Sequence, residues 1–404
     1  MTIDTTPGPP PLPCPVQEPA GNATTYYVAI NEPGASNDDC DGLSPVDRGG
    51  GRCPFKDFQS ERTFQLLQGV AKVRVEVRGG TYTFATEALT VEGSGASDAD
   101  QVVLTAYGDE GVVFDGRRLL REVIRVAGQH ATVERVTLQN AGAYNLEVRT
   151  GRNHRVQCNR FLANRASDSM KGDPGTGVTE VRYNDFSGWD SQAIDMTGVR
   201  DWVIEENVFH HPAGSRGNAI GAKFGSRGVV IARNLFKDTR GLNFGGTGSS
   251  HGNEFEAYEL VAEGNRFENV SDHPVRFYSC SNCEFRDNDV SGAEAGIVLG
   301  GEERDGPSGC PGGCRPTQGA VVVGNRLRDL RGNLESPPDT FWGVNRSETE
   351  GLQASDNLYC VSSGGEASFF YGAERLPFDA WTTRLGTDST SVVVSENDAL
   401  CLGW

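Results

Sequence analysis

The chain has 404 residues, of which 52 are glycine, nearly twice the usual share, and its formal net charge is −18. The acidic balance argues against nonspecific nucleic-acid binding, and the glycine content argues against a coiled coil. No run of about 18 apolar residues marks a transmembrane helix. The length allows one large repetitive domain or about two to three ordinary ones.

The first segment, residues 1–22, is rich in proline and is predicted to be a disordered linker. It carries no secretory signal. We therefore expect an upstream signal to have been removed and the protein to be secreted, periplasmic or displayed on the cell surface. Residues 23–120 are predicted to form an N-terminal cap and the first rungs of a repetitive fold.

Residues 121–360 repeat one pattern, an apolar pair followed by Asn, any residue and a large apolar residue, as in VRYNDF and VIARNLF. Each copy holds only short strands, so stacked copies have to share one core. A period near 24 predicts an all-β, right-handed parallel β-helix of roughly ten rungs, and the skeleton of leucine-rich repeats is missing. The repeated asparagines are expected to form a structural ladder: Asn159, Asn184, Asn207, Asn234, Asn265, Asn288, Asn325 and Asn357. Aromatic residues are expected to stack inside the coil: Phe161, Phe186, Phe209, Phe236 and Phe267.

A second pattern lies midway between the asparagines: an apolar residue, a variable one and another apolar one. In a strand the flanking residues point into the core and the central residue points out. The predicted outward row is Arg125, Glu147, Lys171, Asp195, Lys223, Asn243 and Arg276. This row is either a solvated face with paired charges or the floor of a substrate groove, and long insertions after Asn243 and Val298 favour the groove.

Residues 361–404 are predicted to be a C-terminal capping tail. The ten cysteines favour an oxidising compartment. We expect local disulfides around Cys40 and Cys53, within SCSNC and GCPGGC, and between the cysteines that bracket the tail. Zinc is the weaker alternative for the two short pairs, because no histidine accompanies them at metal-like spacing. Cys158 is expected to be a buried free thiol in a strand, and His210–His211 to be a turn.

Three segments resemble the secreted right-handed β-helix polysaccharide lyases, with family 9 pectate lyases closest and family 6 alginate and chondroitin lyases next. The segments TYYVAINEPGASNDDCDGLSP, CPFKDF and VEVRGGTYTF are similar to the entry of these proteins. The stretch GNAIGAKFGSRGVVIARNLFKDTRGLNFGG is similar to the part of family 9 that carries the Brønsted-base lysine, and that lysine maps to Lys223. The segment PFDAWTTRLGTDSTSVVV is similar to the ending of many secreted β-helices. The resemblance spans most of residues 25–395.

The resemblance implies a lyase that cleaves an acidic, uronate-containing polysaccharide by β-elimination, with a lysine base in a cationic groove. The expected catalytic residues are Lys223, Lys171, Arg276 and His251. The expected substrate-binding residues are Arg125, Glu147, Asp195, Asn243, Arg227, His273 and Tyr278. His251, His273, Tyr278 or water is the candidate acid. Lysine becomes a base only when burial or neighbouring cations lower its pKa, and a nearby Asp195 would oppose this.

Calcium is a further expectation, with Asp168, Asp190 and Asp195 as ligands. The acidic cluster of family 9 is not reproduced, however, and Lys171 stands where a ligand carboxylate is expected. Three alternatives stay open: a glycoside hydrolase that uses Glu147 and Asp195, an epimerase, and a non-catalytic carbohydrate-binding β-helix. The expected partner is an anionic polysaccharide, with no nucleic acid, and the expected state is a monomer.

Overall fold

The computed structural model describes residues 14, 23–84, 86–162, 168–214, 217–246, 255–300, 315–332, 337–344, 349–363 and 365–402. The chain divides into two compact units, each of which is described by itself. The first holds residues 1–193, 206–208 and 212–216, and the second holds residues 194–205, 209–211 and 217–404. The domain boundaries inferred from the sequence stay predictions.

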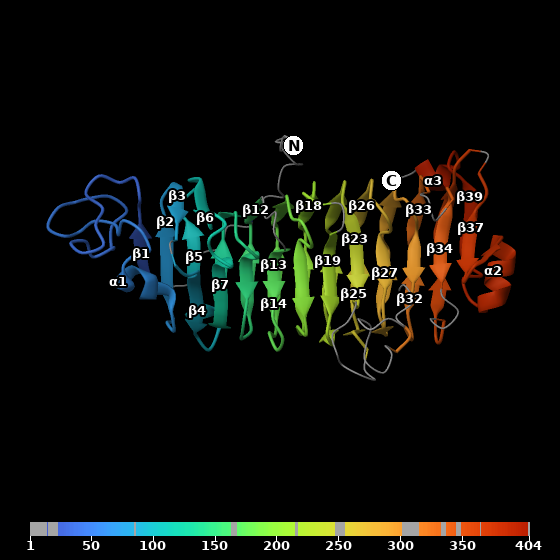
Figure 1. Ribbon diagram of the computed structural model, residues 1–404, viewed down its shortest axis with the longest axis horizontal. Helices are drawn as coiled ribbons and strands as arrows, with labels where there is room; N and C mark the ends of the chain where they lie inside the picture. Colours follow the sequence, from blue (N-terminus) through green and yellow to red (C-terminus); the bar gives the residue numbers. More distant parts are fainter. Residues whose placement is uncertain are drawn as a thin grey trace. The chain divides into compact units, whose positions relative to one another are not determined.

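Parallel strands in three sheets build the first unit (Figure 1). The first sheet holds β1 (Thr24–Val28), β2 (Val73–Val77), β5 (Val102–Ala106), β8 (Ala131–Glu134), β11 (His154–Gln157) and β14 (Thr179–Arg182). The second holds β4 (Leu89–Ser94), β7 (Glu122–Gln129), β10 (Tyr144–Val148) and β13 (Asp168–Gly172). The third holds β3 (Gly80–Thr83), β6 (Val112–Asp115), β9 (Thr137–Gln139), β12 (Arg160–Leu162) and β15 (Asp185–Ser187). From β5 to β15 the chain visits the sheets in a repeating order, so each rung contributes one strand to each sheet.

The second unit repeats this arrangement. Its first sheet holds β17 (Trp202–Glu205), β21 (Val230–Ala232), β25 (Val261–Glu263), β29 (Glu284–Arg286), β32 (Val321–Val323) and β35 (Gln353–Ser355). Its second holds β16 (Ile194–Thr197), β19 (Asn218–Lys223), β23 (Arg240–Phe244), β27 (Val275–Phe277), β31 (Ile297–Leu299), β34 (Thr340–Val344), β37 (Ser368–Tyr371) and the antiparallel β38 (Glu374–Leu376). Its third holds β22 (Leu235–Lys237), β26 (Arg266–Glu268), β30 (Asp289–Ser291), β33 (Arg326–Arg328), β36 (Leu358–Val361) and β39 (Val392–Ser395).

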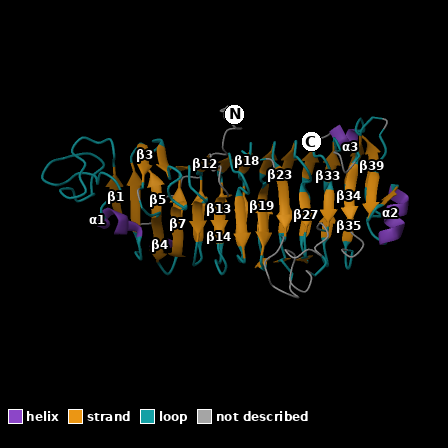
Figure 2. Cartoon of the chain, in the orientation of Figure 1, coloured by secondary structure: helices purple, strands orange, loops and turns teal. Residues whose placement is uncertain are grey.

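A few elements lie outside this scheme. A short side sheet in the second unit holds β20 (Ser226–Arg227), β24 (Ala257–Tyr258) and β28 (Cys280–Ser281). Strand β18 (Val208–His210) is shared between the residue sets of the two units. Helices are short and lie outside the three sheets (Figure 2): α1 (Glu61–Phe64) and the 3₁₀ turns Gln65–Leu67 and Asp98–Asp100 in the first unit, and α2 (Phe378–Leu385) and α3 (Ala399–Leu402) in the second. The all-β parallel β-helix predicted from the repeats is confirmed.

The asparagine ladder is also confirmed, and its hydrogen bonds explain why the residue recurs. In the second unit, Asn265 Nδ2 donates to the Ile231 carbonyl at 2.8 Å. Its Oδ1 accepts from the backbone N–H of Asn234 at 2.9 Å, and its own N–H donates to Asn288 Oδ1 at 2.9 Å. Each side chain therefore satisfies backbone groups that a tight turn leaves buried.

Aromatic stacking inside the coil follows the prediction. The rings of Phe161 and Phe186 stack with centroids 4.4 Å apart in the first unit. In the second unit Phe236 stacks on Phe209 at 4.8 Å and on Phe267 at 4.7 Å. All five rings are fully buried, so the stacked aromatic rings fill the core beside the asparagine turns.

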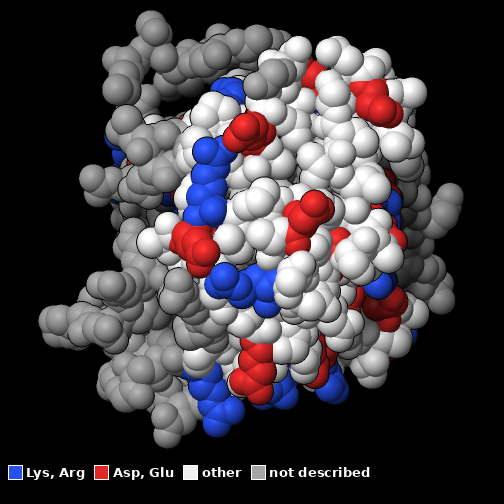
Figure 3. Space-filling view, turned by 90° about the vertical axis from the view of Figure 1, so that its right-hand side faces the viewer, with Lys and Arg blue, Asp and Glu red and all other residues white. Residues whose placement is uncertain are grey.

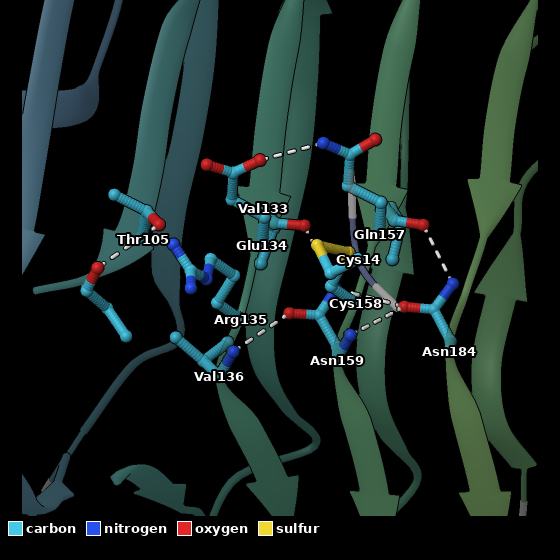
Figure 4. The surroundings of a disulfide bond; sticks show 12 residues. Cys14, Thr105, Val133, Glu134, Arg135, Val136, Gln157, Cys158, Asn159 and Asn184 are labelled. Carbon is cyan, nitrogen blue, oxygen red and sulfur yellow. Dashed lines mark hydrogen bonds between the residues drawn. A yellow bond between two sulfur atoms is a disulfide. The ribbon is translucent and has the colours of Figure 1, made fainter. Parts of the chain in front are cut away.

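The expectation for Cys158 is wrong. Cys158 forms a disulfide with Cys14, a residue 144 positions earlier in the sequence (Figure 4). It lies in the turn after β11 rather than in a strand, and its φ of 58° belongs to the left-handed region. Its side chain is half-buried, and its sulfur bonds to Cys14.

The other disulfides follow the sequence interpretation. Cys40 pairs with Cys53, Cys280 with Cys283, and Cys360 with Cys401. The bond between Cys280 and Cys283 excludes a zinc-thiolate site at SCSNC. Cys310 and Cys314 of GCPGGC lie outside the described residues. Among the residues that are described, no cysteine is free.

Candidate functional site

The outward row of the first unit has the predicted register. In the second sheet, Arg125 of β7 pairs with Glu147 of β10, and Glu147 pairs with Lys171 of β13. The flanking Ile124, Leu146 and Met170 are fully buried, as an alternating strand requires. Three charged residues of mixed sign therefore stand side by side on one face.

Glu147 is the buried centre of this row. Its side chain is 1% exposed, and its carboxylate lies 3.5 Å from Arg121 Nη2 and 3.7 Å from Arg125 Nε. Arg149 Nη1 lies 4.0 Å away. Burial raises the pKa of Glu147, and the carboxylates of Asp173 and Glu122 raise it further. Burial likewise raises the pKa of Asp173.

Arg121 and Arg149 are site residues that the sequence pattern did not single out. Arg121 lies just before β7 and stacks over the Tyr144 ring, with its guanidinium carbon 5.3 Å from the ring centroid. Arg149 lies just after β10. The pattern searched for the central residue of each apolar triplet, and both arginines fall outside the triplets. Their clustering in sequence near Arg125 and Glu147 was the available signal.

The predicted row of the second unit is wrong at Lys223. Asp195 pairs with Gly221, Gly221 with Asn243, and Asn243 with Arg276. Lys223 instead pairs with Thr197, two residues further along the strand. The stretch Ile220–Gly221–Ala222 is itself an apolar triplet, but its central glycine has no side chain to mark the outward position.

Lys223 nevertheless lies beside Asp195. Its Nζ is 3.0 Å from Asp195 Oδ1, with the lysine side chain 30% exposed and the aspartate 8% exposed. The register of β19 and β23 continues from Ala222–Phe244 to Lys223–Gly245, with the Gly245 N–H donating to the Ala222 carbonyl at 2.7 Å. Lys223 therefore stands at the end of β19, next to a residue without a side chain.

Tyr278 stands on the other side of Gly245. Its N–H donates to the Phe244 carbonyl at 2.6 Å, which continues the pairing of Phe244 with Phe277. Gly245 has a φ of 98°, and a Cβ there would lie 1.6 Å from the Tyr278 carbonyl oxygen, so only glycine fits. Lys223 and Tyr278 thus lie two strands apart in the sheet, and the strand spacing puts their backbones roughly 9–10 Å from each other. Gly245 is the residue between them.

Arg276 completes this constellation. Its Nη1 donates to the Tyr278 hydroxyl, and its guanidinium carbon lies 5.1 Å from the Tyr278 ring centroid. Its Nη2 is 3.8 Å from Asp272 Oδ1. Arg276, Tyr278, Asn243, Asp195 and Lys223 therefore form one patch of the second unit.

His273 lies behind Arg276. Its Nδ1 is 2.6 Å from Asp272 Oδ1, and burial lowers the pKa of the imidazole. Burial alone would raise the pKa of Asp272, but the contacts with His273, Arg276 and Arg240 lower it overall. His273 is only 4% exposed, so it orients the Asp272–Arg276 pair rather than facing a ligand.

The other predicted site residues are less central. Arg227 lies on β20 of the side sheet, where its guanidinium carbon is 4.7 Å from the Tyr258 ring centroid. His251 lies outside the described residues. The turn expected at His210–His211 is wrong for His210, which ends strand β18, whereas His211 follows the strand with a φ of 47°. The Nδ1 atoms of the two rings lie 2.7 Å apart.

Calcium finds little support in the described residues. Asp168 Oδ1 accepts the backbone N–H of Gln192 at 2.9 Å, and Asp195 faces Lys223. Asp190 is exposed beside Gly214. No group of three His, Cys, Asp or Glu side chains within the described ranges is arranged to hold a metal ion. The involvement of calcium stays a prediction.

The surface does not carry a uniform negative charge. On the face drawn in Figure 3, acidic and basic side chains are interspersed among uncharged ones. The net charge of −18 therefore does not show where basic side chains gather on the surface. Across the described part of the chain, no helix has the length and apolar character needed to span a membrane.

Comparisons with known proteins define the fold class. Residues 169–308 match the family model described as a right handed beta helix region. An endo-xylogalacturonan hydrolase from Aspergillus tubingensis superimposes with a TM-score of 0.53 at 9% identity, covering 80% of this chain and 91% of the hydrolase. The protein is therefore a right-handed parallel β-helix.

Two further solved structures are more distant. A mannuronan C-5 epimerase A-module, AlgE6 from Azotobacter vinelandii, has a TM-score of 0.49 at 13% identity, covering 84% of this chain and 95% of the module. Pectate lyase Pel9A has a TM-score of 0.38 at 14% identity, covering 94% of this chain and 82% of the lyase. No curated protein sequence matches the chain. The resemblance to β-helix proteins is confirmed for the fold, and these identities leave the reaction open.

Proposed function

We propose that this protein is a polysaccharide lyase that cleaves an acidic polysaccharide by β-elimination, with Lys223 as the base. The observation that carries the proposal is the placement of Lys223 and Tyr278 on either side of Gly245, beside Arg276. A base, a proton donor and a cation are the three groups that elimination from a uronate needs.

Arg276 is assigned to the substrate carboxylate. Its side chain is 23% exposed, and a guanidinium matches a carboxylate with two parallel hydrogen bonds. Neutralising the carboxylate makes the adjacent C5 proton more acidic. Asp272 and His273 hold the guanidinium from behind, so its position does not depend on the ligand.

Lys223 and Tyr278 carry the proton transfers. Lys223 Nζ takes the C5 proton, and the electron pair of the C5–H bond forms the C4–C5 double bond while the C4–O4 bond breaks. The Tyr278 hydroxyl gives its proton to the leaving oxygen, and Arg276 Nη1 stabilises the phenolate that remains. One proton is taken and one is given, so the step is balanced.

Asp195 is the ionic partner of the base. Its carboxylate lies 3.0 Å from Lys223 Nζ, the opposing contact expected from the sequence. In the proposed step the ammonium proton of Lys223 passes to Asp195 before the amine takes the C5 proton. The base is therefore assigned to the Lys223–Asp195 pair, with Lys223 as the group that touches the sugar.

The test is a panel of pectate, alginate, glucuronan, chondroitin, heparin and hyaluronan, each with calcium and with a chelator. The unsaturated uronate formed by elimination absorbs in the ultraviolet, so rising absorbance reports cleavage and names the polymer. Comparison of the calcium and chelator arms tests the metal. Lys223→Ala is expected to abolish the signal while keeping the circular dichroism and melting of the wild type.

The matched control is Lys237→Ala, because Lys237 lies on β22 of a different sheet of the same unit. It should cleave like the wild type. Full activity in Lys223→Ala would overturn the proposal. Reducing ends without absorbance would instead favour the hydrolase, and binding without any product would favour a carbohydrate-binding β-helix.

A secreted or cell-surface location belongs to the same proposal. Its support is the four disulfide bonds among the described residues, because such bonds persist in oxidising compartments. Fractionation of the producing cells tests it.

A further inference from the structure

Three arginines of the first unit converge on one buried carboxylate. Arg121, Arg125 and Arg149 place guanidinium nitrogens 3.5, 3.7 and 4.0 Å from the oxygens of Glu147. They come from the segment before β7, from β7 itself and from the segment after β10. Arg125 also donates through Nη2 to Glu122, so Glu147 is the carboxylate that all three guanidiniums share rather than the partner of each hydrogen bond.

The carboxylate of this cluster is buried, whereas its three arginines are partly exposed to solvent. Glu147 is 1% exposed, whereas Arg121 is 60%, Arg149 48% and Arg125 32% exposed. Within the described residues, neither carboxylate oxygen of Glu147 has a hydrogen bond, although both are buried. The arginines thus lie near enough to be oriented by Glu147 while keeping hydrogen-bond donors for another anion.

The charge of the cluster depends on Glu147. Arg121, Arg125 and Arg149 face Glu122 and Glu147, and Asp173 is a third carboxylate nearby. Burial favours the neutral form of Glu147, which would leave these three arginines against two charged carboxylates. Arg121 is also held over the Tyr144 ring, so its guanidinium has a defined plane.

We propose that the three arginines around Glu147 form a binding subsite for an anionic group of an acidic polysaccharide. They are Arg121, Arg125 and Arg149. The group is a carboxylate or a sulfate, since both accept the paired hydrogen bonds of a guanidinium. Glu147 is the positioning residue and does not touch the ligand. The subsite shares the polysaccharide class with the proposed function but requires no elimination, because it belongs to the first unit and Lys223 to the second.

The test measures binding in the Lys223→Ala background, so that cleavage does not consume the probe. The probes are oligogalacturonate for carboxylate, dextran sulfate for sulfate and neutral dextran as the blank, titrated by calorimetry at two salt concentrations. Arg121→Gln with Arg149→Gln is expected to weaken binding of one charged probe at least about tenfold. The matched control is Arg160→Gln, an arginine of the same unit that is 57% exposed on another sheet, and it should bind unchanged.

Glu147→Gln gives a second and opposite readout. Removing the buried charge while keeping the shape is expected to tighten binding of dextran sulfate at neutral pH. Dextran sulfate keeps its charge in acid, so the wild type should bind it more tightly as Glu147 protonates, and the variant should show less of this pH dependence. Asp173, whose pKa burial also raises, is present in both proteins and accounts for the pH dependence that remains.

Equal affinity in the double arginine variant and its parent would overturn the subsite, and so would an equal loss in Arg160→Gln. Weaker binding in Glu147→Gln would overturn the role given to the carboxylate. Cleavage that persists in the Lys223→Ala background would refute the proposed lyase mechanism without touching the subsite. The two proposals can therefore fail separately.

Discussion

Removing one asparagine of the ladder tests the account of the core. Asn265→Ala deletes the acceptor of the Asn234 N–H and the donor to the Ile231 carbonyl, both within the buried turn. It also deletes two side-chain bonds, one to Asn234 and one to Asn288. A buried backbone group left without a partner costs about 1–3 kcal/mol, so two of them predict a loss of about 2–6 kcal/mol in unfolding free energy.

Chemical denaturation followed by circular dichroism measures this loss. Asn243→Ala is the matched control, because Asn243 is an outward residue whose side-chain oxygen, among the described atoms, accepts no hydrogen bond. The control should change the free energy by less than about 1 kcal/mol. A similar small change in Asn265→Ala would show that water replaces the side chain, and the ladder would then not be a source of stability.

Three further predictions concern other parts of the chain. Burial lowers the pKa of His154 from 6.5 to about 4. The unfolding free energy should therefore fall by about 3 kcal/mol as the pH drops from 6.5 to 4, because the unfolded state takes up the proton first. Denaturation measured against pH should show a shallower fall in His154→Gln, and an unchanged fall would refute the assignment. Replacing Cys14 and Cys158 by serine should lower the unfolding free energy by about 2–4 kcal/mol in the same assay, and an unaltered value would mean that the bond constrains nothing. Gly245→Ala should be destabilised by more than about 2 kcal/mol, because the added methyl group would clash with the Tyr278 carbonyl. Gly225 also has a positive φ, of 77°, but has open space around it, so Gly225→Ala should lose only about 1 kcal/mol. Equal losses would show that backbone strain, and not the clash, causes the destabilisation.

The asparagine ladder, the stacked aromatic rings and the outward row of the first unit could be predicted from the sequence, because each is a local pattern that repeats from rung to rung. Asn265 and Phe267 recur with a fixed spacing, and the same turn imposes both. The row of Arg125 and Glu147 was predictable since apolar neighbours define the strand face. A right-handed β-helix followed from these patterns.

Features that depend on exact register or distant partners were not readable in the same way. The outward position between Asp195 and Asn243 is Gly221, and an apolar triplet centred on Lys223 overlapped the true one. Phe224, the last residue of that overlapping triplet, has a φ of 61° and lies beyond the end of β19. The partner of Cys158 lies 144 residues away, and spacing does not encode disulfide connectivity.

The asparagine turn also sets where the chain tolerates a change of length. Successive ladder asparagines are 23 residues apart between Asn265 and Asn288 but 37 apart between Asn288 and Asn325, yet the same hydrogen bond joins each pair. Extra chain is therefore accommodated elsewhere in the rung, and later strands keep their phase. An added residue within the turn would instead exchange the inward and outward faces of the strand that follows. The length of a rung can therefore vary outside the asparagine turn, and the turn itself is the part whose length is fixed.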